Sequence, residues 1–140
     1  MDFFRSSDRS RYMVRLDRGE EVIQTLSGFV TGEGLRGGDI TGIGAVESVV
    51  IGYFDLQRRE YDRRTLEGEL ELLSFVGNLA WADGVAVVHA HVTLGGPDFS
   101  VVGGHLFSAD IAVTGEFYIT AFDQDIMRHL DEQTGLKLIR

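Results

Sequence analysis

The stretch HAHVTLGGPDFSVVGGH, residues 89–105, holds three of the four histidines of the chain and decides how its second half folds. Gly-Gly-Pro-Asp at residues 95–98 is a strong turn signal, because Pro97 presets its own backbone angle and aspartate favours turns. We expect the returning strand to begin at residue 104, where paired glycines let the backbone bend sharply. The stretch therefore predicts a hairpin that carries His105 back toward the first two histidines.

His89, His91 and His105 form a candidate metal site. On a strand His89 and His91 share one face, with Cα atoms about 6.6–6.8 Å apart, so their imidazoles can converge on one ion. His105 would be the third ligand, and the absence of a fourth leaves a position open for water or substrate, as in catalytic zinc sites. The alternative is a set of hydrogen-bonded core histidines without a metal. His129, on an expected helix, is interpreted as a solvent-facing residue.

The rest of the sequence predicts one domain of the α+β class. Residues 17–34 carry an apolar stripe typical of an amphipathic helix, with Asp17 and Glu20 at capping-box spacing and Gly32 or Gly34 as its end. Abundant glycine and β-branched residues predict a largely antiparallel sheet of about six to eight strands. A short C-terminal helix is expected over residues 123–135. The predicted strands cover residues 12–16, 39–55, 60–68, 69–81, 84–94, 105–113, 115–122 and 136–139.

One helix cannot cover so many strands. The remaining apolar face should therefore meet another layer or another subunit, which favours an oligomer. We divide the chain into an N-terminal arm, residues 1–10, and a domain over residues 11–140.

Composition excludes several classes of protein. The chain has no cysteine, so disulfides, thiolate nucleophiles and sulfur-ligated zinc are ruled out. No apolar run approaches the roughly 20 residues that span a bilayer, and no secretory signal is recognisable, so we expect a cytoplasmic protein.

The net charge of −9 repels a phosphate backbone, so nucleic-acid binding would need a local basic patch. One patch lies within residues 1–18, which hold five arginines. The other supplies the candidate DNA or phosphate contacts Arg58, Arg59, Arg63 and Arg64. Both patches can also be solvated strand edges with interspersed charges of opposite sign.

The remaining motifs point to no reaction. The sequence lacks the Gly-x-Ser-x-Gly nucleophile motif, and its glycine-rich residues 32–44 lack the lysine of a P-loop. Glu116 and Asp98 are candidate acids or bases near a metal, but their spacing singles out neither. The catalytic residues, and whether the protein is an enzyme, stay open.

Several segments together resemble the PPC domain, which is named for its conservation in plants and prokaryotes. They are GIGAVESVVIGYFD (42–55), GELELLSFVGNLA (68–80), HAHVTLGGPDFSVVGGHL (89–106), TGEFYI (114–119) and TGLKLI (134–139). The most specific parts are the Gly-Pro-Asp turn with the following Val-Val-Gly-Gly and the block Ser74 to Asn78. The resemblance extends from about Tyr12 to Ile139.

The resemblance implies a curved, largely antiparallel sheet, assembly as a homotrimer and a zinc site at His89, His91 and His105. Plant members carry an AT-hook before the domain and act as nuclear regulators. This chain has only Arg18-Gly19 followed by glutamate, so the Arg-Gly-Arg-Pro core of an AT-hook is missing. The plant Gly-Arg-Phe-Glu-Ile-Leu strand is replaced by GELELL at residues 68–73, so plant partner specificity should not transfer.

Three functions follow from these observations. The first is a homotrimeric DNA-binding or regulatory protein that carries the three-histidine zinc site. The second is a metal-dependent protein that binds a small molecule, or an enzyme of unknown reaction, without affinity for DNA. The third is a structural trimer without catalysis. Zinc is the expected cofactor in the first two.

Overall fold

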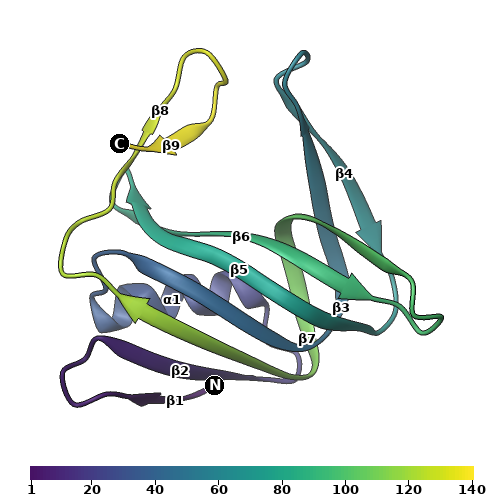
Figure 1. Cartoon of the computed structure of the whole chain (residues 1–140), viewed down its shortest axis with the longest axis horizontal. Coiled ribbons are helices and arrows are strands. Elements are labelled where there is room, and N and C mark those ends of the chain that lie inside the picture. The colour runs from purple at the N-terminus through teal and green to yellow at the C-terminus, as the bar shows by residue number, and fades with distance from the viewer.

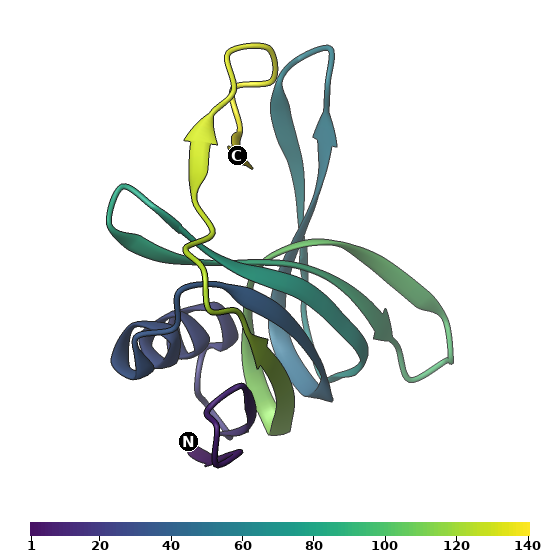
Figure 2. The same ribbon diagram turned by 60° about the vertical axis from the view of Figure 1, so that its left-hand side comes forward.

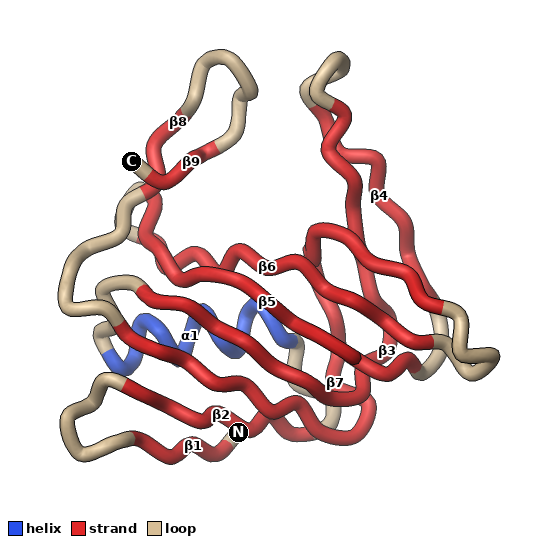
Figure 3. Tube along the Cα trace, viewed as in Figure 1, coloured by secondary structure: helices blue, strands red, loops and turns tan.

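The computed structural model describes residues 1–140 and contains one helix and nine strands (Figures 1 and 3). The elements are β1 (Asp2–Arg5), β2 (Arg11–Asp17), α1 (Val22–Glu33), β3 (Gly38–Asp55), β4 (Glu60–Leu66), β5 (Leu70–Ala82), β6 (Val85–Gly95), β7 (Val101–Ala121), β8 (Arg128–Leu130) and β9 (Lys137–Ile139).

The predicted helix is confirmed as α1, although it begins differently from expectation. Its N-cap is Glu21, whose carboxylate accepts hydrogen bonds from the backbone N–H groups of Ile23 and Gln24. A carboxylate is favourable there because it lies at the positive end of the helix dipole. The Glu20 carboxylate instead accepts a hydrogen bond from the backbone N–H of Asp17 at 2.7 Å. Gly34, with φ 65°, ends the helix in the left-handed conformation.

Seven antiparallel strands form one strongly curved sheet in the order β1-β2-β7-β6-β5-β3-β4 (Figure 2). An additional β7–β3 pairing closes β3, β5, β6 and β7 into a ring. The predicted strands at residues 105–113 and 115–122 are halves of β7, which runs through Gly115 without a turn. A Cβ at Gly115 would lie 2.6 Å from Ile111 and 2.7 Å from Phe117, so this glycine permits close side-chain packing inside the sheet.

The hydrophobic core lies between α1 and one face of the sheet. The helix packs against β6 and β7 through its apolar stripe. Within the core the rings of Phe75 and Phe117 meet edge to face, and both side chains have 0% exposure. The buried positions of β6 alternate from Ala86 to Leu94, which leaves its two histidines on the face turned away from α1.

The predicted C-terminal helix is wrong. Residues 128–139 form a small hairpin in which β8 pairs with β9. Asp131 explains the difference, because its carboxylate accepts hydrogen bonds from the Thr134 backbone N–H and hydroxyl and so stabilises a turn where a helix would have to continue. Gly135, with φ 75°, completes that turn. The expected final strand is confirmed as β9.

Two arms rise from the face of the sheet opposite α1 (Figure 1). One is the hairpin of β3 and β4, and the other is the hairpin of β8 and β9. Beyond the arms this face exposes large apolar side chains, as the sequence predicted. They include Ile43, Leu73, Val76, Val113 and Tyr118, each with at least half of its surface exposed. The single helix does not combine the length and the hydropathy that crossing a membrane requires.

Candidate metal centre

The hairpin predicted from the opening stretch is present and brings the three histidines together. β6 and β7 are antiparallel neighbours, and His91 and His105 lie directly opposite each other in their register. The returning strand begins at Val101, three residues before the predicted start, because pairing resumes as soon as the turn closes. His89 lies two residues before His91 on the same face.

The turn is held by its own polar groups. The Gly96 N–H donates to the Ser100 carbonyl at 2.9 Å, and the Asp98 carboxylate accepts from the Ser100 hydroxyl at 2.6 Å. Gly104, beside His105, allows β3 to approach β7 closely, because a Cβ there would lie 2.8 Å from the Gly52 carbonyl oxygen. The turn and this close approach together fix the position of His105.

The three imidazoles form a compact cluster. Their ring centroids are 5.1–5.5 Å apart, and one ligand atom from each ring lies within 4.8 Å of the others. His91 is exposed, whereas His89 and His105 are half-buried. Burial lowers the pKa of His89 to about 4, with Arg128 and His91 adding to the effect. Burial likewise lowers the pKa of His105 to about 4, so both rings are neutral at pH 7 and available as ligands.

The cluster fits a metal ion. Nitrogen ligands about 2.0–2.1 Å from a tetrahedral ion lie about 3.4 Å apart, so the rings need to contract only modestly from their present spacing. The Nδ1 atom of His105 is buried and has no hydrogen-bond partner. Such an atom is costly unless it gains a partner, and a metal ion is one that this site could accept.

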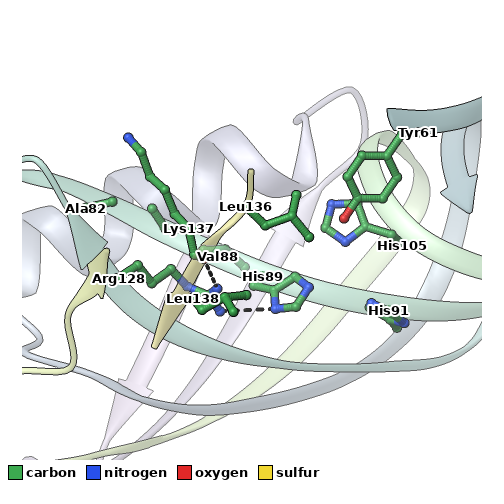
Figure 4. A pocket seen from close by; sticks show the side chains of 11 residues that line it. Tyr61, Ala82, Val88, His89, His91, His105, Arg128, Leu136, Lys137 and Leu138 are labelled. Carbon is green, nitrogen blue, oxygen red and sulfur yellow. Dashed lines mark hydrogen bonds between the residues drawn. The ribbon is translucent and has the colours of Figure 1, made fainter. Parts of the chain in front are cut away.

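The histidines lie in a cavity of about 470 Å³ between the two arms (Figure 4). Its walls are largely apolar and include Ala82, Val87, Leu136 and Leu138. Tyr61 from β4 lies beside His105, with ring centroids 5.0 Å apart. None of the eleven lining residues is a carboxylate. Glu116 and Asp98, the candidate acids of the sequence, are not among them.

Arg128 on β8 is the site residue that sequence reasoning missed. Its side chain donates to the Asn78 amide oxygen at 2.7 Å, to the Lys137 carbonyl at 2.9 Å and to the Nδ1 atom of His89 at 3.1 Å. The available signal was the Asp131 to Gly135 turn, which predicts a hairpin and so makes residue 128 part of a strand. His129, the next residue, is exposed as expected, but on β8 rather than on a helix.

The four arginines proposed as DNA contacts lie on β4 and its turn, and all are exposed. Arg58 contacts three carboxylates, those of Asp55, Glu60 and Asp62. The guanidinium of Arg63 lies 3.9 Å from the ring centroid of Phe107, which itself contacts His105. Arg59 and Arg64 form no ion pair. In the N-terminal patch, Arg5 and Arg15 likewise pair with acidic side chains.

Comparison with known proteins shows the family. Residues 5–123 match the model of the Plants and Prokaryotes Conserved (PCC) domain, which is the PPC domain that the sequence resembles. The chain belongs to this family, and no curated protein matches it.

Solved structures share the fold over almost the whole chain. A PPC protein from Pyrococcus horikoshii is 35% identical, with a TM-score of 0.87 over 93% of this chain and 90% of its own. A metal-containing protein from Archaeoglobus fulgidus is 37% identical, with a TM-score of 0.86 over 99% and 96% of the two chains. A candidate DNA-binding protein from Bacteroides thetaiotaomicron is 27% identical, with a TM-score of 0.94 over 99% and 96%.

Proposed function

We propose that this chain is a homotrimeric cytoplasmic protein in which His89, His91 and His105 hold a zinc ion and present it to a small molecule in the cavity. The observation that carries the proposal is the convergence of three imidazoles from two strands, with ligand atoms within 4.8 Å. The similar protein from Archaeoglobus fulgidus is described as metal-containing, which supports a metal in this fold. The chain supplies three ligands, which leaves a fourth position toward the cavity.

Bound zinc would act as a Lewis acid toward an oxygen of the ligand. The residues of the chain have separate tasks. His89 and His105 stay neutral because they are half-buried, while the walls of the cavity exclude part of the solvent. The absence of a lining carboxylate argues against a carboxylate general base inside the cavity, so we propose binding and name no reaction.

The metal content of the purified protein tests this proposal. We expect about one zinc per chain by elemental analysis and a melting temperature that falls when a chelator removes the metal, because binding to the native state stabilises it. A fully folded protein that takes up no zinc, and whose melting temperature ignores chelators, would rule the proposal out.

The exposed apolar face supports the homotrimer. Val76, 57% exposed, lies in register with Thr41, which in turn lies opposite Tyr118, 55% exposed. Large apolar patches of this kind mark interfaces, and we place a second copy of the chain there.

Val76→Glu is expected to shift the mass measured by sedimentation equilibrium from three times 15.5 kDa toward that of the monomer. Phe99→Glu, which changes a turn residue outside this face, should leave the trimer intact. A trimer unaffected by Val76→Glu places the interface elsewhere.

DNA binding is the second candidate, favoured by the description of the Bacteroides thetaiotaomicron protein and by the unpaired Arg59 and Arg64. We expect weak binding of duplex DNA, because the net charge of −9 opposes it. If the two arginines contact phosphates, replacing both by alanine should make the negative slope of log K against log salt less steep by about 1.8. Binding that is undetectable at about 0.15 M salt, or that ignores added salt, excludes this function.

A further inference from the structure

The strongest unexplained feature of the molecule is a buried positive charge beside the histidines. Arg128 is 9% exposed and has no carboxylate within ion-pair distance. The Nε atom of Arg128 is buried without a hydrogen-bond partner. The other two guanidinium nitrogens donate to a neutral amide, a carbonyl and a neutral imidazole. Arginine remains protonated in proteins, and buried charges are normally paired. Arg128 therefore lacks the anionic partner that a buried charge normally has.

The surroundings of Arg128 are suited to an anion although the chain as a whole is acidic. No carboxylate lines the cavity. Lys137, the other lining cation, is paired with Asp83 at 2.5 Å, and its side chain extends away from the histidines (Figure 4). Arg63 adds positive charge on the opposite side, close enough to contribute to the lowered pKa of His105. Arg128 is thus the unneutralised cation that a ligand would meet.

Metal binding would increase the need of Arg128 for an anionic partner. In the metal-free protein the Nδ1 atom of His89 accepts a hydrogen bond from Arg128. A neutral His89 that binds a metal through Nδ1 gives up that lone pair, and one that binds through Nε2 carries its proton on Nδ1. In both cases Arg128 loses this acceptor. The guanidinium then has a free donor beside a second positive charge, and an anion oxygen can satisfy both.

We propose that the cavity binds a small monocarboxylate whose charged group lies between Arg128 and the metal held by the three histidines. The planar guanidinium matches the two oxygens of a carboxylate, and the apolar side chains Val87, Leu136 and Leu138 suit a short hydrocarbon tail. This inference rests on the proposed metal site and specifies its class of ligand. Because the carboxylate and the metal attract each other, each must raise the affinity of the protein for the other by the same factor.

Butyrate and its uncharged analogue butyramide are the matched probes. Titration of cobalt-loaded protein with butyrate is expected to change the visible spectrum of the metal, while butyramide and inorganic phosphate leave it unchanged. Arg128→Gln should raise the Kd for butyrate at least about tenfold, the range expected for a lost charged hydrogen bond. Arg59→Gln, the same change at an exposed arginine that does not line the cavity, should change the Kd by less than about threefold. Butyrate should also raise the zinc affinity of the wild-type protein.

Arg128→Lys keeps the charge but not the fork of donors, so it tests the site should Arg128→Gln fail to fold. An intermediate Kd is expected for this variant. The inference is overturned if butyrate does not bind the metal-loaded protein, if butyramide binds equally well, if only phosphate binds, or if the folded Arg128 variants keep the wild-type Kd. If the wild-type protein takes up no metal, the proposed function fails instead. Calorimetry of the metal-free protein then decides whether butyrate binding depends on Arg128.

Discussion

A chain carrying His91→Ala is expected to fold normally and to contain almost no zinc. His91 is exposed on β6, so its side chain contributes little to the core and its removal leaves the sheet intact. The same change takes away one of three proposed ligands. Loss of a residue that only orients a ligand costs about 10–100-fold in metal affinity, and loss of the ligand itself should cost more than about 100-fold. Elemental analysis and competition with a zinc-binding dye measure both quantities.

His129→Ala is the matched control, since it removes the one histidine outside the cluster, an exposed side chain on β8. It should keep one zinc per chain and the wild-type affinity. Far-ultraviolet circular dichroism of the two variants separates loss of metal from loss of fold. A folded His91→Ala chain that retains zinc at wild-type affinity would show that the metal is held elsewhere.

The sequence was sufficient to predict that His89, His91 and His105 come together, because the geometry of this cluster is local. The His-x-His spacing places two rings on one face of a strand, and the Gly-Gly-Pro-Asp turn returns the chain within a few residues. The structure places His105 opposite His91, as this argument requires. The amphipathic helix was predictable for the same reason, since an apolar stripe and a glycine end are properties of one short segment.

Features that depend on distant residues were not predictable in this way. The C-terminal segment has the composition of a helix, but the turn at Asp131 and the contacts of Arg128 with Asn78 and Lys137 favour a hairpin. Arg128 lies 39 residues from His89 in sequence, and only the folded chain joins them. The continuity of β7 through Gly115 is also a tertiary effect, because Ile111 and Phe117 fill the space beside that glycine.

The histidine cluster also makes the stability of the metal-free protein depend on pH. Burial lowers the pKa of His89 and His105 in the folded state to about 4, while an unfolded histidine titrates near 6.5. Between these values the unfolded chain binds protons that the folded chain does not. The free energy of unfolding should therefore fall as the pH drops below about 6.5 and level off, for these two groups, near pH 4.

Full shifts of both groups would correspond to about 4 kcal/mol at pH 5, and remaining contact with solvent lowers our expectation to about 2 kcal/mol. Urea unfolding of metal-free protein at pH 7.5 and pH 5 measures this loss. Between pH 7.5 and pH 5, acidic groups whose native pKa lies lower, such as Asp8 at about 2, contribute little to the change in the free energy of unfolding. His105→Gln should remove about half of the pH dependence. A free energy that stays constant from pH 7.5 to 5 would mean that these rings are solvated in the native protein. A proton and a metal ion compete for the same lone pair of histidine. At pH 5.5 a solvated histidine is mostly protonated. Because their pKa values are lowered, His89 and His105 should still be available to zinc at this pH.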